Sequence, residues 1–124
     1  MRGCRVQIVG VDPWTYMRLD ARPWELADPD ADLRILLCHF PRVVDSLPGG
    51  AFDLVLSGHM HDGQICLPHP RGKVRLAHPR APYNRGVYRV AATTLHVSSG
   101  LGTTFVPLRF NARPEATELV LQST

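Results

Sequence analysis

The stretch "LVLSGHMHDGQICLP" (residues 54–68) decides the fold class, because it joins a hydrophobic strand to a cluster of polar residues. Short apolar runs closed by turn residues indicate buried strands, so we expect a strand over residues 52–58. His59, His61 and Asp62 follow directly, between Gly58 and Gly63. Neutral imidazole is a common metal ligand, so the pattern favours a bound ion. Two histidines on a surface loop are the alternative explanation of a bare His-x-His pattern.

The chain before residue 52 also contains apolar runs that are separated by connecting segments. "CRVQIVGVD" (4–12) and "LRILLCHF" (33–40) predict two further buried strands. Short helices are expected near 23–27 and from Pro41 to Leu47, where "PGG" (48–50) ends the second one. Strand, connection, strand, helix, strand is typical of an α/β layer, so the expected fold class is α/β.

The second half of the chain has a different character. Segment 66–86 is dense in Pro and Arg and lacks periodicity, so we expect a long loop there. Segment 87–100 predicts a hairpin that turns at 91–93, and 117–123 predicts a final strand. With 124 residues and neither internal repeats nor a composition break, the chain is expected to form a single domain.

Charge is distributed unevenly along the chain, although the net charge is only +3. Residues 63–114 contain no Asp or Glu, which favours an anionic partner such as phosphate, nucleic acid or a lipid headgroup, with a solvated basic face as the alternative. The basic residues of this segment are Arg71, Lys73, Arg75, Arg80, Arg85, Arg89, Arg109 and Arg113.

Hydrophobicity and cysteine usage indicate a cytoplasmic protein. No apolar run approaches the roughly 20 residues of a membrane span, and the apolar stretch after Arg5 is too short for a secretion signal. Three widely spaced cysteines form no disulfide framework and favour a reducing compartment. We therefore expect a soluble chain, with peripheral membrane association as an alternative.

His39 is the third candidate ligand, because it closes the predicted strand 33–40. If this strand and the one over 52–58 are parallel neighbours, His39, His59 and His61 meet at one edge of the sheet. Cys38 points to the opposite face and is expected in the core. Cys66 within reach of the cluster would make a His/Cys zinc site, which remains an alternative. We expect no metal role for the other histidines, His69, His78 and His96.

These segments together resemble the calcineurin-like metallophosphoesterases, in the bacterial branch that includes membrane-associated phosphohydrolases. The resemblance covers most of residues 5–122. It rests on "ILLCHFP" (35–41), on "DLVLSGHMHDGQICLP" (53–68), which is similar to the family's Gly-His-x-His motif continuing into Gly-Gly-Gln, and on "TTLHVSSGLGTTFVPLRF" (93–110) with "RPEATELVL" (113–121).

The resemblance implies hydrolysis of phosphomonoester, phosphodiester or pyrophosphate bonds at a two-metal centre of Mn, Fe or Zn. It implies that His39 and His59 bind one ion, that His61 binds the other, and that Gly58 provides the tight turn. The implied site is shaped by Gly58, Asp62, Gly63 and Gln64. Its basic loop would bind a phosphate or an anionic membrane surface through Arg71, Lys73 and Arg75.

The chain also departs from the family pattern. Met60 and Asp62 replace small residues; Met60 is expected to turn away from the metals, and Asp62 to orient a histidine or weaken phosphate binding. The family's Asp-x-His, Gly-Asp-x-x-Asp and Gly-Asn-His motifs are absent. The resemblance therefore implies the C-terminal portion of the domain over residues 1–124, as a partial four-layer αββα sandwich lacking the N-terminal half.

Three expectations follow from that incompleteness. The isolated chain should be inactive, should bind at most one ion, and should self-associate or need the missing N-terminal half as a partner. A non-catalytic remnant or binding module is one alternative. A nucleic-acid binder that stacks bases on Tyr83 and Tyr88 of segment 66–89 is another, although no recognised nucleic-acid module is present, so no specific nucleic-acid partner is expected.

Overall fold

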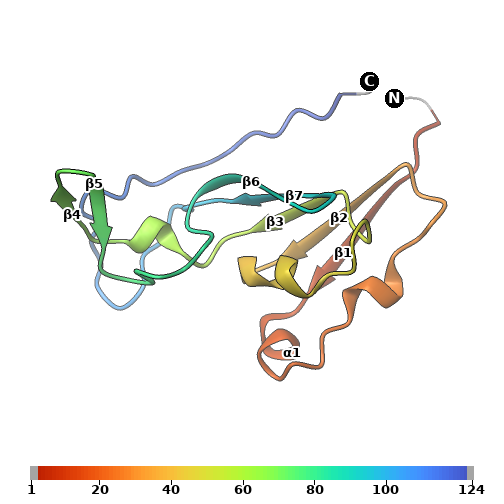
Figure 1. The fold of residues 1–124 in the computed structure, drawn as a ribbon, viewed down its shortest axis with the longest axis horizontal. Coiled ribbons are helices and arrows are strands. Elements are labelled where there is room, and N and C mark those ends of the chain that lie inside the picture. The colour runs from red at the N-terminus through yellow and green to blue at the C-terminus, as the bar shows by residue number, and fades with distance from the viewer. Residues whose placement is uncertain (1–2, 123–124) are drawn as a thin grey trace.

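A five-stranded mixed sheet forms the centre of the computed structural model, which describes residues 3–122 (Figure 1). The strand order is β1 (Val6–Val11), β2 (Leu33–Cys38), β3 (Leu54–Ser57), β7 (Thr93–Val97) and β6 (Gly86–Val90). Neighbours from β1 to β7 are parallel, and only β6 runs antiparallel, as the hairpin partner of β7. The expected α/β class is confirmed, and the sheet is compatible with part of a metallophosphoesterase sandwich.

The parallel register brings the carboxyl ends of the strands to one edge. Leu37 of β2 lies opposite Leu56 of β3, which lies opposite His96 of β7. The condition under which His39 and His59 would meet, parallel pairing of the second and third strands, is therefore fulfilled. Residues that immediately follow β2 and β3 consequently lie close together, although the strands are far apart in the sequence.

One face of the sheet carries the hydrophobic core. Leu36, Val55 and Leu95 are completely buried there. The 3₁₀ helix η2 (Pro41–Ser46) covers them with Val43 and Val44. Each such side chain contributes about 1.5–3 kcal/mol by leaving water, so this face holds the sheet and its connections together.

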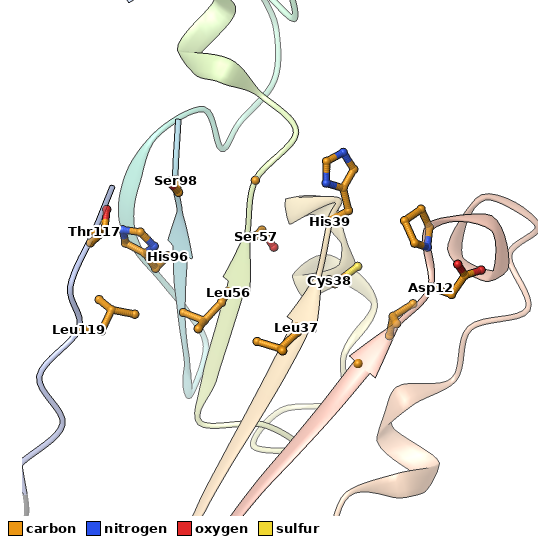
Figure 2. Close-up of a pocket in the computed structure, with 14 residues that line it drawn as sticks. Asp12, Leu37, Cys38, His39, Leu56, Ser57, His96, Ser98, Thr117 and Leu119 are labelled. Atoms are coloured by element: carbon orange, nitrogen blue, oxygen red, sulfur yellow. The ribbon is translucent and has the colours of Figure 1, made fainter. Parts of the chain in front are cut away.

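The opposite face is largely uncovered in this chain. Ile8 is 62% exposed, Leu37 42% and Val87 68%. The C-terminal stretch runs along this side as an extended segment without a strand partner, and Figure 2 shows its Thr117 and Leu119 beside His96. The predicted strand over 117–123 is thus not formed at 117–122, because no neighbouring strand offers hydrogen bonds; residue 123 lies outside the described part of the chain.

The short helices differ in detail from the predictions. The segment that we read as turn-rich contains α1 (Pro13–Met17), whose first turn is capped by Asp12: its carboxylate accepts a hydrogen bond from the Thr15 amide at 3.0 Å. Asp followed by Pro is a helix-start signal that the prediction overlooked. The two predicted helices are 3₁₀ turns, η1 (Pro23–Leu26) and η2. Among the described residues, no helix is long and apolar enough to cross a membrane.

The predicted loop over 66–86 is partly wrong. It contains a two-stranded antiparallel hairpin, β4 (Cys66–His69) and β5 (Gly72–Arg75), in which Leu67 pairs with Val74. Proline and arginine obscured the alternation of these short strands, which form a sheet of their own. The second predicted hairpin is confirmed as β6 and β7.

Candidate metal centre

His39 and His59 meet beyond the carboxyl ends of β2 and β3. The Nε2 atom of His39 and the Nδ1 atom of His59 are 3.2 Å apart. Figure 2 shows the ring of His39 projecting past the end of its strand. Parallel strand pairing creates this approach: His39 follows β2, His59 follows β3, and these two strands are parallel neighbours.

The loop that carries His59 has an unusual backbone. Four non-glycine residues within it adopt positive φ, namely His59 (68°), His61 (47°), Asp62 (51°) and Gln64 (56°). Such conformations cost free energy and cluster at functional sites. The tight turn that we expected at Gly58 begins instead at His59, because Gly58 does not adopt positive φ and a Cβ added to it would meet no atom within 4 Å.

Glycine is required at position 63 instead. Gly63 has φ +84°, and a Cβ there would lie 2.5 Å from the Cβ of Arg75. Gln64 is buried next to it and holds the segment 104–108: its Oε1 accepts from the Thr104 amide at 2.6 Å, and its Nε2 donates to the carbonyls of Thr104, Val106 and Leu108. Both residues therefore shape the loop by packing and hydrogen bonding.

His61 does not join the His39–His59 pair. Its Nδ1 accepts a hydrogen bond from Nη2 of Arg109 at 2.9 Å. Arginine cannot accept a proton, so Nδ1 is the acceptor and Nε2 carries the proton. Arg109 also donates to the carbonyls of Ser99 and Gly102, which fixes its guanidinium and with it the ring of His61. Sequence reasoning assigned Arg109 only to the basic segment, since nothing in the spacing linked it to His61.

Both histidines of the loop favour the neutral form. Burial lowers the pKa of His59, and the neighbouring His39 and His78 lower it further. Burial and the charge of Arg109 lower the pKa of His61. Neutral imidazole is the form that binds a metal, so these surroundings prepare His59 for ligation near neutral pH.

His78 is a neighbour that the sequence did not predict. Its ring centroid lies 5.0 Å from that of His59, while the Phe40 ring lies 4.6 Å from His59 on an edge-to-face approach. His78 follows the β4–β5 hairpin, and only the path of that hairpin brings it back to the site. Aromatic rings thus support the His39–His59 pair, and a third imidazole lies beside it.

Asp62 has a different role from either of those predicted. It is 1% exposed and accepts hydrogen bonds from Lys73 and Arg75, with the Arg75 Nε at 3.0 Å. It therefore faces the hairpin and neither orients a histidine nor faces a bound phosphate. Consequently, two of the predicted anion-binding residues, Lys73 and Arg75, are engaged by a carboxylate, whereas Arg71 is exposed at the hairpin turn.

Cys38, Cys66 and Met60 are all buried. Cys38 is buried in the core as expected, and Met60 is also part of that core. Cys66 is buried and its Sγ donates to the carbonyl of Asp62 at 3.1 Å. Burial raises the pKa of the Cys66 thiol, which disfavours the thiolate that zinc binds. The His/Cys zinc alternative is not supported, because no group of three or more His, Cys, Asp or Glu side chains that could hold a metal ion occurs among residues 3–122.

A hollow of about 670 Å³ opens beside His39 at the carboxyl edge of the sheet (Figure 2). Leu37 and Leu56 form its floor, with Asp12 on one side and His96 and Thr117 on the other. Open α/β sheets bind ligands outside the carboxyl ends of their strands, so the hollow has the position expected of a ligand site.

The donor geometry fits one ion held by two imidazoles. Two nitrogens bound to a tetrahedral zinc at about 2.0–2.1 Å are themselves about 3.3 Å apart, close to the 3.2 Å between His39 and His59. Among residues 3–122, no group of three or more His, Cys, Asp or Glu side chains is arranged to hold a metal ion. The chain thus presents a partial ligand set rather than a complete centre.

The chain is similar to several metallophosphoesterases. The chain is 35% identical to the uncharacterized metallophosphoesterase YkuE of Bacillus subtilis, over 98% of this chain and 42% of YkuE. It is 31% identical to the phosphodiesterase YaeI of Escherichia coli, over 71% of this chain and 32% of YaeI. It is 38% identical to a transmembrane protein with metallophosphoesterase domain of Bos taurus, over 72% of this chain and 20% of that protein. No family model and no solved structure matches.

Proposed function

Because this chain is homologous to metallophosphoesterases over nearly its whole length, we propose that it supplies two imidazole ligands to a divalent metal site that hydrolyses phosphoester bonds. The observation that carries the proposal is the 3.2 Å approach of His39 and His59 at the carboxyl edge of the sheet. A bound ion of this kind polarises a phosphoryl oxygen and lowers the pKa of its water.

The residues of the chain have separate tasks in this proposal. His39 and His59 hold one ion, and Phe40 keeps the ring of His59 in place. Arg109 orients His61 through its hydrogen bond to Nδ1. Binding a second ion through Nε2 would require His61 to leave Arg109, because Nδ1 would then carry the proton.

The proposed site needs further ligands from outside the region that the chain spans. The chain covers 42% or less of the lengths of these relatives. A bridging carboxylate and a group that protonates the leaving oxygen are absent from the His39–His59 pair. We therefore propose that this chain corresponds to the C-terminal portion of a phosphoesterase domain, which is inactive alone. Phosphomonoesters, phosphodiesters and pyrophosphates are all candidate substrates, and the similarity to the phosphodiesterase YaeI makes a diester the first to test.

Metal titration tests the ligand pair. We expect Zn²⁺ or Mn²⁺ to bind with one equivalent per chain in calorimetry. His59→Ala should weaken metal affinity by about tenfold or more, since even removing a residue that only supports a ligand has an effect of that size. His69→Ala is the matched control, because His69 lies on the exposed β4–β5 hairpin. Two retained equivalents, or binding that both variants leave unchanged, would contradict the proposal.

Turnover tests the chemistry. The chain alone with Mn²⁺ should not hydrolyse bis-4-nitrophenyl phosphate above background. Activity should appear when the chain is co-expressed with the part of YkuE that lies outside the match, and should disappear again with His59→Ala. Hydrolysis by the chain alone that depends on His59 and His61 would show that it builds a complete site by itself.

A further inference from the structure

Exposed apolar side chains gather on the segment 104–108, which Gln64 holds, and on Leu76, which lines the same hollow as Phe105 and Val106. Phe105 is fully exposed, Leu76 is 53% exposed and Leu108 51% exposed. We call this surface the apolar tip; it consists of Leu76, Phe105, Val106 and Leu108. Large exposed apolar patches on soluble domains mark interaction sites.

The tip is held in a defined shape. Gln64 makes four hydrogen bonds to the backbone of residues 104–108. The adjoining residue Phe110 exchanges backbone hydrogen bonds with residues 64 and 66, since its amide donates to the Gln64 carbonyl and its carbonyl accepts from Cys66. Figure 1 shows the β4–β5 hairpin and the loop that follows β7 together at one end of the molecule. The hairpin adds the exposed cross-strand pair Leu67 and Val74.

The segment that carries the apolar tip contains basic residues and no acidic ones. Residues 63–114 contain no Asp or Glu. The adjoining Asp62 is 1% exposed and engaged by Lys73 and Arg75, so it presents no negative charge to solvent. Arg71 is exposed at the turn of the hairpin. Apolar side chains together with basic residues are the combination that binds the interface of an anionic bilayer.

The tip also borders the histidines. A second hollow, of about 410 Å³, is lined by His59, His61 and His78 on one side and by Leu76, Phe105 and Val106 on the other. A surface on which the tip rests would therefore meet the mouth of the candidate metal centre.

We propose that the apolar tip docks the protein on an anionic lipid bilayer, with Phe105 and Leu108 inserted at the headgroup boundary and Arg71 against lipid phosphates. Docking of this kind needs no metal and stands independently of the proposed hydrolysis. If both proposals hold, the docked site is presented to phosphoesters at the membrane surface.

Vesicle flotation tests the docking. The chain, kept in EDTA, is mixed with vesicles of equal parts phosphatidylcholine and phosphatidylglycerol, or of phosphatidylcholine alone. We expect binding to the anionic vesicles and a loss of about tenfold or more in partitioning for Phe105→Ser/Leu108→Ser, the factor that burial of a large apolar side chain provides. Leu26→Ser is the matched control, because Leu26 is 65% exposed but lies on η1. Circular dichroism establishes that the variants are folded.

Several outcomes would overturn the proposal. These are absence of binding to anionic vesicles, equal binding to both vesicle types, or binding that the double variant leaves unchanged. Metal-free binding to an oligonucleotide with no vesicle binding would assign the basic segment to nucleic acid instead. A dimer that the double variant converts to monomer, without vesicle binding, would assign the tip to self-association. His59→Ala should leave vesicle binding unchanged. Failure of the metal proposal and failure of the docking proposal can therefore be told apart.

Discussion

The imidazoles of His39 and His59 approach to 3.2 Å although 20 positions separate them in the chain. Each ring follows the end of a strand, and the two strands are parallel neighbours. Two neutral imidazoles so close can share one proton or one metal ion, but they repel each other when both are protonated. The relationship therefore links the site to pH and to stability.

Acid should destabilise the metal-free chain through this loop. The pKa of His59 and that of His61 are lowered, chiefly by burial, from 6.5. The unfolded chain therefore binds more protons below about pH 6.5, so the free energy of unfolding should fall as the pH drops from there through the folded pKa values. Urea unfolding between pH 5 and 7 measures this change. His59→Asn/His61→Asn should flatten the dependence, whereas His69→Asn should keep it; an unchanged slope in the double variant would refute the assignment.

Asp62 should be important for stability because its buried carboxylate pairs with Lys73 and Arg75 and lies 3.8 Å from Arg85. Asp62→Asn leaves Lys73 and Arg75 without their counter-charge, and breaking a buried pair in this way costs roughly 3–5 kcal/mol. Since Lys73 and Arg75 remain 27% and 30% exposed, we expect the lower end of that range in urea unfolding. Glu25→Gln is the control, because its ion pair with Arg22 is exposed and should change stability by less than about 1 kcal/mol. Equal effects would argue against a structural role for Asp62.

The two glycines that flank the histidines should respond differently to alanine. Gly63→Ala places a Cβ at positive φ and 2.5 Å from Arg75, so it should destabilise the protein by roughly 1–3 kcal/mol. Gly58→Ala meets no atom within 4 Å and should stay within about 0.5 kcal/mol of the parent. Thermal unfolding of both variants measures the difference. A larger loss of stability for Gly58→Ala than for Gly63→Ala would show that the tight turn depends on Gly58.

Gln64 should control the order of residues 104–108. Gln64→Glu keeps an oxygen that can accept from the Thr104 amide but removes the donor to three carbonyls. We expect faster hydrogen exchange over 104–108 in this variant, and additional loss of Thr104 amide protection in Gln64→Ala. Protection of the β2 amides should not change. Equal protection of 104–108 in all three proteins would show that the segment is held by other contacts.

The uncovered sheet face should promote association of the isolated chain. Ile8, Leu37 and Val87 are each more than 40% exposed on that face, and such patches favour contacts with a second apolar surface. Light scattering should show a mass that rises with concentration, and Ile8→Ser/Val87→Ser should reduce it. A sharp monomer peak with cooperative unfolding in the parent chain would contradict the expectation.

The sequence by itself determined the first three strands and the position of His39 and His59 at the ends of two of them, because apolar runs and strand-end residues are local signals, whereas the parallel pairing of these strands came from the tertiary structure. The sequence also indicated the family, through motifs that are contiguous in the chain. The tertiary structure alone decided which partners these residues take. Arg109 donates a hydrogen bond to His61, and Lys73 and Arg75 donate to Asp62. The ring of His78 lies beside that of His59. Those contacts depend on how the β4–β5 hairpin and the 101–110 loop fold back over the sheet edge, and this long-range packing leaves no periodic pattern in the sequence.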